Sequence, residues 1–334
     1  MRKELGKKAM VLGICMLALL FAGAAFAAEK EGAYPDNISF ISGGAGGTYY
    51  FIGTGVAKAL NDKFEGVSCA MESTSSAPLE NATLVSRATE TIGIITLDGI
   101  LDALSGNPKT GFRAPITNIK VIMGGHIQFN YLGAKKGSGI KTIADMAGKR
   151  FGTLTKSSSI RQQSEALLIA QGLDPEKDLK ITVLTYPEQV DAIKDDKIDI
   201  FNCGGGSPQA MIMEIATSSP IELLTIPKEL EDKMLAAHPY WRIATIPAGT
   251  YAGQDEDARV TTVQTLIVAN ENLSDKFIYD LMEVVFANND ILVGVHPEGK
   301  SWSWETTLDF YERQKDALPW HPGAIKYIEE RAAK

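Results

Sequence analysis

Short apolar strands alternate with amphipathic helical segments along almost the whole chain, and this order limits the possible folds more than any other feature. The strand-like runs are 38–44, 67–73, 91–97, 120–127, 149–154, 180–186, 197–205 and 261–269. Between them, residues 49–64, 80–90, 142–148, 159–173 and 187–196 have apolar side chains at helical spacing. Such alternation predicts an α/β protein with mainly parallel sheets flanked by crossover helices.

The first 27 residues are typical of an export signal. Four basic residues and one acidic residue precede or enter an apolar run that ends in Ala25-Phe26-Ala27. A basic segment, an apolar run and a small-residue site predict a Sec signal peptide that is cleaved after Ala27, which places the mature protein in the periplasm. The alternative is an uncleaved membrane anchor. No later stretch reaches the roughly 20 apolar residues that a spanning helix needs.

The mature chain is acidic. Removing four basic and one acidic residue from totals of 33 and 41 leaves 29 and 40, a formal net charge of −11. This balance argues against nucleic acid or anionic membrane surfaces as partners. Only Cys69 and Cys203 remain, far apart and without a metal-binding motif, so two buried thiols are expected rather than a disulfide or a metal site.

The length after cleavage predicts two lobes, because about 307 residues exceed what one core usually supports. We expect a discontinuous first lobe, 34–125 with 246–334, interrupted by a second lobe, 126–245. Two extended crossings between lobes would form a hinged cleft with room for a ligand.

Four polar loops each follow a strand and precede a helix: 42–50, 72–81, 153–162 and 202–209. In open α/β sheets the ligand crevice lies at the carboxyl ends of the strands, where helix N-termini suit carboxylate or phosphate. Helix capping by Ser, Thr or Asn explains each loop taken alone. Two loops from each lobe could together converge on one anionic group.

The glycine-rich loop 42–50 is not a nucleotide-binding fingerprint, because Tyr49 stands where the third glycine is needed and no P-loop lysine follows. Catalysis is also disfavoured. Of the four histidines, three precede proline, as in turns, and no G-x-S-x-G elbow is present. The chain is therefore expected not to be an enzyme.

Five stretches, in this order, resemble the TAXI-type solute-binding proteins, the extracytoplasmic receptors of one class of TRAP transporters. They are "SGGAGGTYYFIGTGVAKAL" (42–60), "LEN" (79–81), "GSGIKTIADMAGKR" (137–150), "IPAGTYAGQDEDARV" (246–260) and "HPGAIKYIEE" (321–330). The third is common among type II periplasmic binding proteins; the glycine-rich Tyr-Tyr loop combined with the last two is specific. The resemblance covers nearly the whole mature chain.

The resemblance implies a two-lobed type II periplasmic binding protein, without cofactor or metal, that captures a small organic anion and hands it to TRAP permease subunits, most simply as a monomer. An ABC-linked or signalling receptor, or an enzyme on the same scaffold, are the alternatives. The residues that the resemblance and its departures place at the ligand are Ala45, Gly46, Gly47, Thr48, Tyr49, Ser75, Ser76, Ala77, Asn81, Leu97, His126, Gln128, Thr155, Ser157, Ser158, Ser159, Arg161, Gly204, Gly205, Gly206 and Ser207.

Several of these positions depart from the family pattern, and the changes remove or alter polar groups. They are Pro78, 96–98, 126–128 and 157–160. Family members are known for acidic amino acids such as glutamate, but unpaired buried polar atoms cost about 1–3 kcal/mol each. A carboxylate with an aromatic or branched body therefore fits better. Arg161 could pair with that carboxylate, or with Glu165 one helical turn away; Tyr49 and His126 would wall the ligand's body.

Overall fold

The computed structural model describes residues 34–74 and 77–334, so the predicted signal peptide lies outside the described residues. One mixed sheet runs through the molecule in the order β2-β1-β3-β10-β4-β7-β5-β6, with β8 beside β4 and β9 beside β10. The strands are β1 (Asn37–Ile41), β2 (Ser68–Glu72), β3 (Thr91–Thr96), β4 (Ile119–Lys135), β5 (Arg150–Thr153), β6 (Lys180–Val183), β7 (Ile200–Gly205), β8 (Ile221–Leu223), β9 (Arg242–Ile246) and β10 (Ala258–Asn270).

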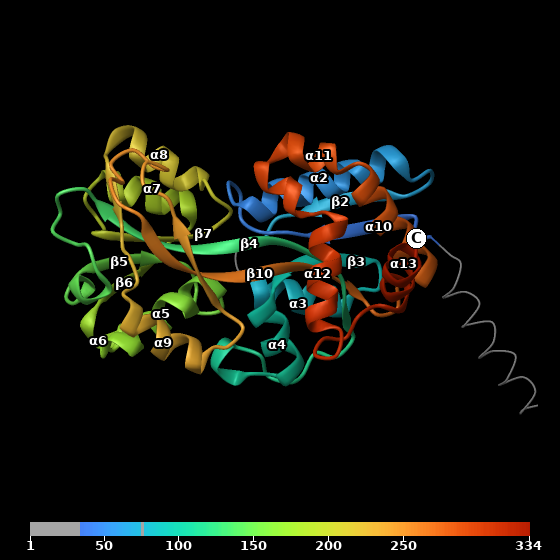
Figure 1. The fold of residues 1–334 in the computed structure, drawn as a ribbon, viewed down its shortest axis with the longest axis horizontal. Coiled ribbons are helices and arrows are strands. Elements are labelled where there is room, and N and C mark those ends of the chain that lie inside the picture. Colours follow the sequence, from blue (N-terminus) through green and yellow to red (C-terminus); the bar gives the residue numbers. More distant parts are fainter. Residues whose placement is uncertain (1–33, 75–76) are drawn as a thin grey trace, which may run out of the picture.

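Two long antiparallel strands, β4 and β10, cross the whole molecule and carry a lobe at each end (Figure 1). In the first lobe β1, β2 and β3 are parallel, and β3 pairs with the second part of β10. In the second lobe β5 is parallel to β6 and β7, and β7 pairs with the second part of β4. The α/β two-lobed fold is thus confirmed, with antiparallel pairs at the centre of the sheet.

Helices cover both faces of each lobe. In the first lobe α2, α10 and α11 lie on one face and α3 and α4 on the other; in the second, α7 and α8 lie opposite α5, α6 and α9 (Figure 1). The helices are α2 (Thr48–Lys63), α3 (Ala77–Arg87), α4 (Leu97–Ser105), α5 (Ser159–Gln171), α6 (Pro175–Asp178), α7 (Tyr186–Lys194), α8 (Ala210–Ser218), α9 (Lys228–Ala237), α10 (Asp275–Ala287), α11 (Asn289–Val295), α12 (Trp304–Gln314) and α13 (Pro322–Ala332), with 3₁₀ turns η1 (Pro108–Thr110), η2 (Ile143–Met146) and η3 (Pro297–Ser301).

The eight predicted strands are all present, and the reason is their apolar content. Every residue of β3 is buried, as are nearly all of β10. The prediction ended one strand at residue 127, whereas β4 continues to Lys135, and the proposed boundary at 125/126 falls inside this strand. The lobe limits therefore stay a prediction. Within the described residues, no helix is both long and apolar enough to cross a membrane.

Cys69 and Cys203 are buried free thiols in different lobes, as expected from the sequence. Cys69 lies in β2 and Cys203 in β7. Burial raises the pKa of the Cys69 thiol to about 12 and raises that of Cys203 as well. Both side chains therefore act as small apolar groups of the core.

A bulge separates the two ends of the β4–β10 ladder. The register shifts between Gln264 and Leu266. Nearby, side chains supply hydrogen bonds to β4 carbonyls: Gln264 donates to Gly125, and Thr265 to His126 with an O–O distance of 2.6 Å. A Cβ at Gly125 would lie 2.3 Å from the Trp302 ring, so only glycine lets this strand pass so close.

Candidate functional site

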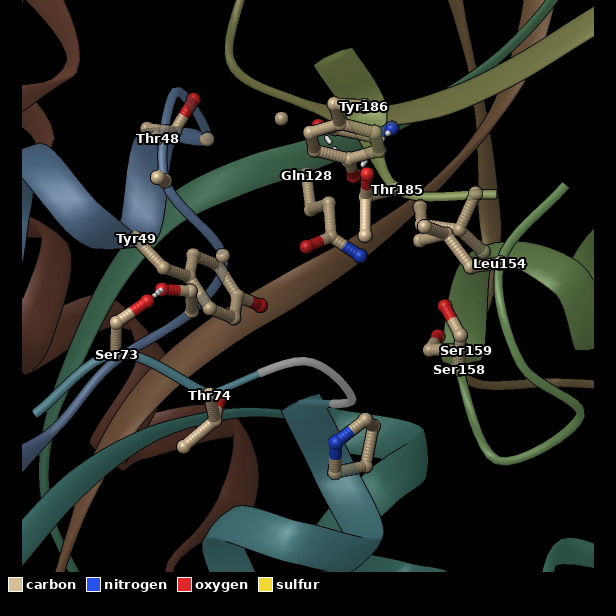
Figure 2. Close-up of a pocket in the computed structure, with 18 of the residues that line it drawn as sticks. Thr48, Tyr49, Ser73, Thr74, Gln128, Leu154, Ser158, Ser159, Thr185 and Tyr186 are labelled. Atoms are coloured by element: carbon tan, nitrogen blue, oxygen red, sulfur yellow. Dashed lines mark hydrogen bonds between the residues drawn. The ribbon is translucent and has the colours of Figure 1, made fainter. Parts of the chain in front are cut away.

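A cavity of about 490 Å³ lies between the lobes, at the carboxyl ends of the parallel strands (Figure 2). Its size is typical of small-molecule sites. It is lined by Gly43, Gly44, Ala45, Gly47, Thr48, Tyr49, Ser73, Thr74, Pro78, Thr96, Gln128, Leu154, Ser158, Ser159, Ile160, Thr185, Tyr186, Pro187, Gly204 and Gly205.

Five strand-to-helix connections bring these residues together. Three come from the first lobe, into α2, α3 and α4, and two from the second, into α5 and α7. Right-handed crossover connections place each such turn at the same edge of its sheet. In the first turn Gly46 has φ +81°, a left-handed conformation that glycine adopts without strain and that turns the chain into α2.

Many of the sequence-predicted residues line this cavity. They are Ala45, Gly47, Thr48, Tyr49, Gln128, Ser158, Ser159, Gly204 and Gly205. Others do not: Gly46, Asn81, Leu97, His126, Thr155, Ser157, Arg161, Gly206 and Ser207 are absent from the lining. Ser75 and Ser76 lie outside the described residues, and Ala77 begins α3. The ligand-binding role of all these residues stays a prediction.

Asn81 supports the cavity loops after β1 and β2 by hydrogen bonds. Its Nδ2 donates to the carbonyls of Ser42 and Ile94 at 2.6 and 2.7 Å, and its Oδ1 accepts from Thr74 Oγ1 at 2.9 Å. Asn81 is fully buried. This one side chain therefore ties the loops after β1 and β2 to β3, a supporting position rather than a contact position.

The structure places Arg161 away from the cavity. Its Nε donates to Glu165 Oε1 at 2.7 Å, and its guanidinium also lies 3.6 Å from a carboxylate oxygen of Glu176. The side chain is only 4% exposed. Of the two alternatives that the sequence left open, the pairing with Glu165 is the one present, because position 161 lies on the side of α5 that faces α6 rather than the cavity.

His126 lies behind the cavity wall rather than in it. It shares one face of β4 with Gln128, but the Tyr49 ring covers it at a centroid distance of 5.7 Å, and Trp302 packs on it at 5.7 Å. Burial lowers the pKa of His126 to about 3, so the imidazole is neutral. Leu97 is also displaced: Thr96, the N-cap of α4, lines the cavity in its place.

Gly206 and Ser207 hold the lobes together. The N–H of Gly206 donates to Thr48 Oγ1 at 2.9 Å, and that of Ser207 to Glu298 Oε1 at 3.2 Å. These two N–H groups thus already have acceptors in the first lobe.

Sequence reasoning missed the N-terminus of α7, where Thr185, Tyr186 and Pro187 line the cavity. Tyr186 is anchored by its hydroxyl, which donates to the Gly204 carbonyl at 3.1 Å and accepts from the Gly204 N–H at 3.0 Å. The signal was available, because "LTYPE" follows a strand and precedes a helix like the four loops that were recognised. The other lining residues that were not named individually as ligand contacts are Gly43, Gly44, Ser73, Thr74, Pro78, Thr96, Leu154 and Ile160, and all but Thr96 lie in the recognised loops.

The cavity combines apolar walls with a few free polar groups. Among residues 34–74 and 77–334, no Lys, Arg, His, Asp or Glu lines it. Tyr49 is 6% exposed, and its hydroxyl, which has no hydrogen-bond partner in this described part of the chain, points into the cavity (Figure 2). Burial first, and then the Asp98 carboxylate, hold the pKa of Tyr49 well above its usual value, so the hydroxyl is a donor. The Gln128 amide also points inward.

Asp98 lies just outside the cavity, at the start of α4, and joins the two lobes. It is 2% exposed. Its Oδ2 accepts hydrogen bonds from Ser159 Oγ at 2.5 Å and from Trp241 Nε1 at 2.9 Å, and its Oδ1 accepts from the Gly99 N–H at 2.8 Å. A carboxylate of the first lobe is thus bound by two side chains of the second.

Three solved structures have a similar fold at low sequence identity. The periplasmic binding protein BugD matches with a TM-score of 0.56 and 11% identity, covering 90% of this chain and 98% of that one. MatC from Rhodopseudomonas palustris, solved with malate, matches with a TM-score of 0.53, 14% identity and coverage of 80% and 90%. Rpa4515 from R. palustris, solved with adipate, matches with a TM-score of 0.51, 13% identity and coverage of 86% and 100%. These likenesses establish the fold.

A family model gives the closer assignment. The model of the NMT1-like family matches residues 40–331, which include all five connections around the cavity and both long strands. The chain belongs to the NMT1-like family.

Proposed function

We propose that this protein is an extracytoplasmic solute-binding receptor that captures a small organic anion between its lobes and delivers it to a TRAP membrane permease. The observation that carries the proposal is the cavity itself, where five helix N-termini and the Tyr49 hydroxyl converge around a space that no charged side chain of the described residues lines. Helix N-termini bind anions through free N–H groups and the positive end of the dipole.

The comparisons support an anionic ligand. The similarly folded MatC and Rpa4515 were solved with malate and adipate, both organic acids. For this chain the walls formed by Pro78, Leu154, Ile160 and Tyr186 favour a ligand with a substantial apolar part. We place the boundaries between the two lobes near residues 126 and 245. A ligand that contacts both lobes would favour the closed arrangement.

Delivery to a TRAP permease rests on the sequence motifs 42–60, 246–260 and 321–330, which resemble TAXI-type receptors. The export signal predicted over residues 1–27 and the periplasmic location agree with this role. An ABC-linked or signalling receptor would use the same cavity. Catalysis has less support, because the described lining residues offer no carboxylate, imidazole or thiol to act as acid, base or nucleophile.

The ligand can be identified on the protein as it is purified. The chain from residue 28 onward, exported in a bacterial host, should retain an organic anion that native mass spectrometry detects as a discrete mass shift lost on denaturation. Refolded protein should then bind the same compound by calorimetry. If neither a retained anion nor binding of any organic acid from a broad panel is observed, the receptor proposal is wrong.

Transport is tested separately. In proteoliposomes containing the TRAP membrane subunits from the same genome, uptake of the identified anion should require this protein. Uptake that is unchanged without it would reject TRAP delivery but leave ligand capture intact.

A further inference from the structure

The helix N-termini around the cavity differ in how their positive ends are compensated. Helices α3, α4 and α7 carry Glu80, Asp98 and Glu188 in their first turns. In α7 a capping box is complete, with Glu188 accepting from the Thr185 N–H and hydroxyl at 2.7 Å each. A carboxylate in the first turn offsets the helix dipole and accepts from free N–H groups. These three ends are already supplied with a negative charge.

Helix α5 receives its negative charge from the other lobe. Its own first turn contains no acidic residue, and its N-cap, Ser158, forms no capping hydrogen bond. The Asp98 carboxylate instead accepts from Ser159, the first residue of this 13-residue helix. Asp98 therefore lies where a ligand carboxylate directed at α5 would be drawn.

Helix α2 is different. It has 16 residues, its N-cap Gly47 has no side chain with which to cap, and its first turn contains no acid. The first N–H groups of a helix have no acceptor inside it, so those of Thr48 and Tyr49 depend on another partner. Within the described chain, α2 is the one N-terminus at this cavity without a compensating carboxylate.

A second, independent observation points to a ligand at the same place. Tyr49, in the first turn of α2, is 94% buried, yet its hydroxyl has no partner among the described residues and faces the cavity (Figure 2). A buried donor without a partner is destabilising, so the arrangement favours an acceptor supplied from outside the chain.

We propose that the ligand is a monocarboxylate, with its single carboxylate at the N-terminus of α2 and at the Tyr49 hydroxyl, and an uncharged remainder directed toward α5. Asp98, which lies just outside the cavity and accepts from Ser159, repels a second carboxylate directed at α5. The remainder contacts the apolar walls of the second lobe, Leu154, Ile160 and Tyr186, with the Gln128 amide as its polar contact.

This inference rests on the proposed function and narrows its ligand class. It also distinguishes this cavity from those of the similarly folded MatC and Rpa4515, which were solved with the dicarboxylates malate and adipate. Like charges brought together in a desolvated site repel strongly, which is the basis of the expected selectivity.

The experiment compares matched acids by calorimetry on ligand-free protein: hexanoate with adipate, and 2-oxopentanoate with 2-oxoglutarate. The two acids of each pair share a carbon skeleton and differ only in the second carboxylate. The monocarboxylate of each binding pair should be favoured by at least about tenfold. Asp98→Asn, which keeps an acceptor for Trp241, should reduce or reverse this preference.

Two further variants keep the test decisive. Asp102→Asn removes a carboxylate one turn later in α4, which accepts from Asn107 at 2.7 Å and contacts neither Ser159 nor Trp241, and it should leave the preference unchanged. Tyr49→Phe should weaken every binding carboxylate about tenfold while the mono-to-di preference persists. Thermal unfolding of each variant identifies any that do not fold.

The two proposals fail in different ways. A retained ligand with two carboxylates, or tighter binding of the dicarboxylate in wild-type protein, overturns the inference and leaves the receptor function intact. An unchanged preference in folded Asp98→Asn protein also overturns it. If no organic anion is retained and no acid of the broad panel binds, these four probes included, the receptor function itself is rejected.

Discussion

The hydroxyl of Thr48 accepts a hydrogen bond from the backbone N–H of Gly206 at 2.9 Å, and so joins the first residue of α2 to the loop that follows β7. Gly206 is buried. The next residue, Ser207, donates its backbone N–H to Glu298 of the first lobe. The lobes are therefore bridged at the N-terminus of α2 as well as at Asp98. In the proposed receptor, ligand capture and lobe closure would involve the same helix end.

Removing this bridge should loosen the closed arrangement. Thr48→Val preserves the shape but leaves the Gly206 N–H without its acceptor, at a cost of about 1–3 kcal/mol in the closed state. We expect ligand affinity to fall about tenfold, as measured by calorimetry. Thr54→Val is the matched control, because Thr54 is exposed on the same helix and its hydroxyl bonds only to the Tyr50 carbonyl. Equal affinities in the two variants would contradict the role of the bridge.

Arg161→Ala should affect stability more than binding. The guanidinium is buried against Glu165 and does not line the cavity, so its loss leaves a half-buried carboxylate unpaired. We expect a decrease of about 1–3 kcal/mol in the free energy of unfolding, measured with urea, and a change in ligand affinity of less than about threefold. Glu165→Gln should reproduce the stability loss in part. A large loss of affinity in folded Arg161→Ala protein would instead assign the residue to ligand binding.

Gly125→Ala should strain the centre of the molecule. The added methyl group would lie 2.3 Å from the Trp302 ring, and overpacking of this kind costs about 1–3 kcal/mol. The matched control is Gly294→Ala in α11, where nothing lies within 4 Å of the new Cβ and helix propensity favours alanine by up to about 1 kcal/mol. Differential scanning calorimetry should show a lower Tm for the first variant alone. Similar Tm values would mean that Trp302 moves aside without cost.

Acid should destabilise the protein partly through His126. Burial lowers its pKa to about 3 in the folded state, whereas an unfolded histidine titrates near the ordinary value of 6.5. The unfolded state therefore binds more protons between these values, and the stability contribution, fully present above about pH 6.5, is lost as the pH falls toward 3. The expected slope from this residue approaches about 1.4 kcal/mol per pH unit near pH 5.

His126→Gln isolates that contribution. Urea unfolding at pH 7, 6 and 5 should give a shallower loss of stability for this variant than for the wild-type chain, even if the variant is less stable at pH 7. The remaining slope includes His238 and His296, whose pKa values are also lowered by burial. Parallel pH dependences for wild type and variant would contradict a buried neutral His126.

The elements that the sequence predicted correctly are those whose information is local. Strand β3 is a run of six buried residues, and α5 begins at a serine-rich turn and ends at Gly172. The three-residue strand β8, by contrast, is too short to leave a periodic pattern. Its position is fixed by pairing with β4, a contact that no local pattern encodes.

The sequence predicted several residues that line the cavity, but not the carboxylate of Asp98 that lies beside it. Tyr49 follows from the glycine-rich turn that precedes α2, and the cavity position of Ser159 follows from its loop. Asp98, however, was noted only as part of a departure from the family pattern, because its partners Ser159 and Trp241 lie 61 and 143 residues away in sequence. The pairing of Asp98 with the N-terminus of α5 depends on how the two lobes pack against each other.

The place of β10 in the sheet has a consequence for the order in which the chain can fold. This strand, Ala258–Asn270, lies between β3 and β4, and so completes the first lobe from a segment that follows the whole of the second. As the chain is made from its N-terminus, β3 has an open edge until about residue 270 has emerged, whereas β5, β6 and β7 are already present. The lobe that begins first is therefore the lobe that finishes last.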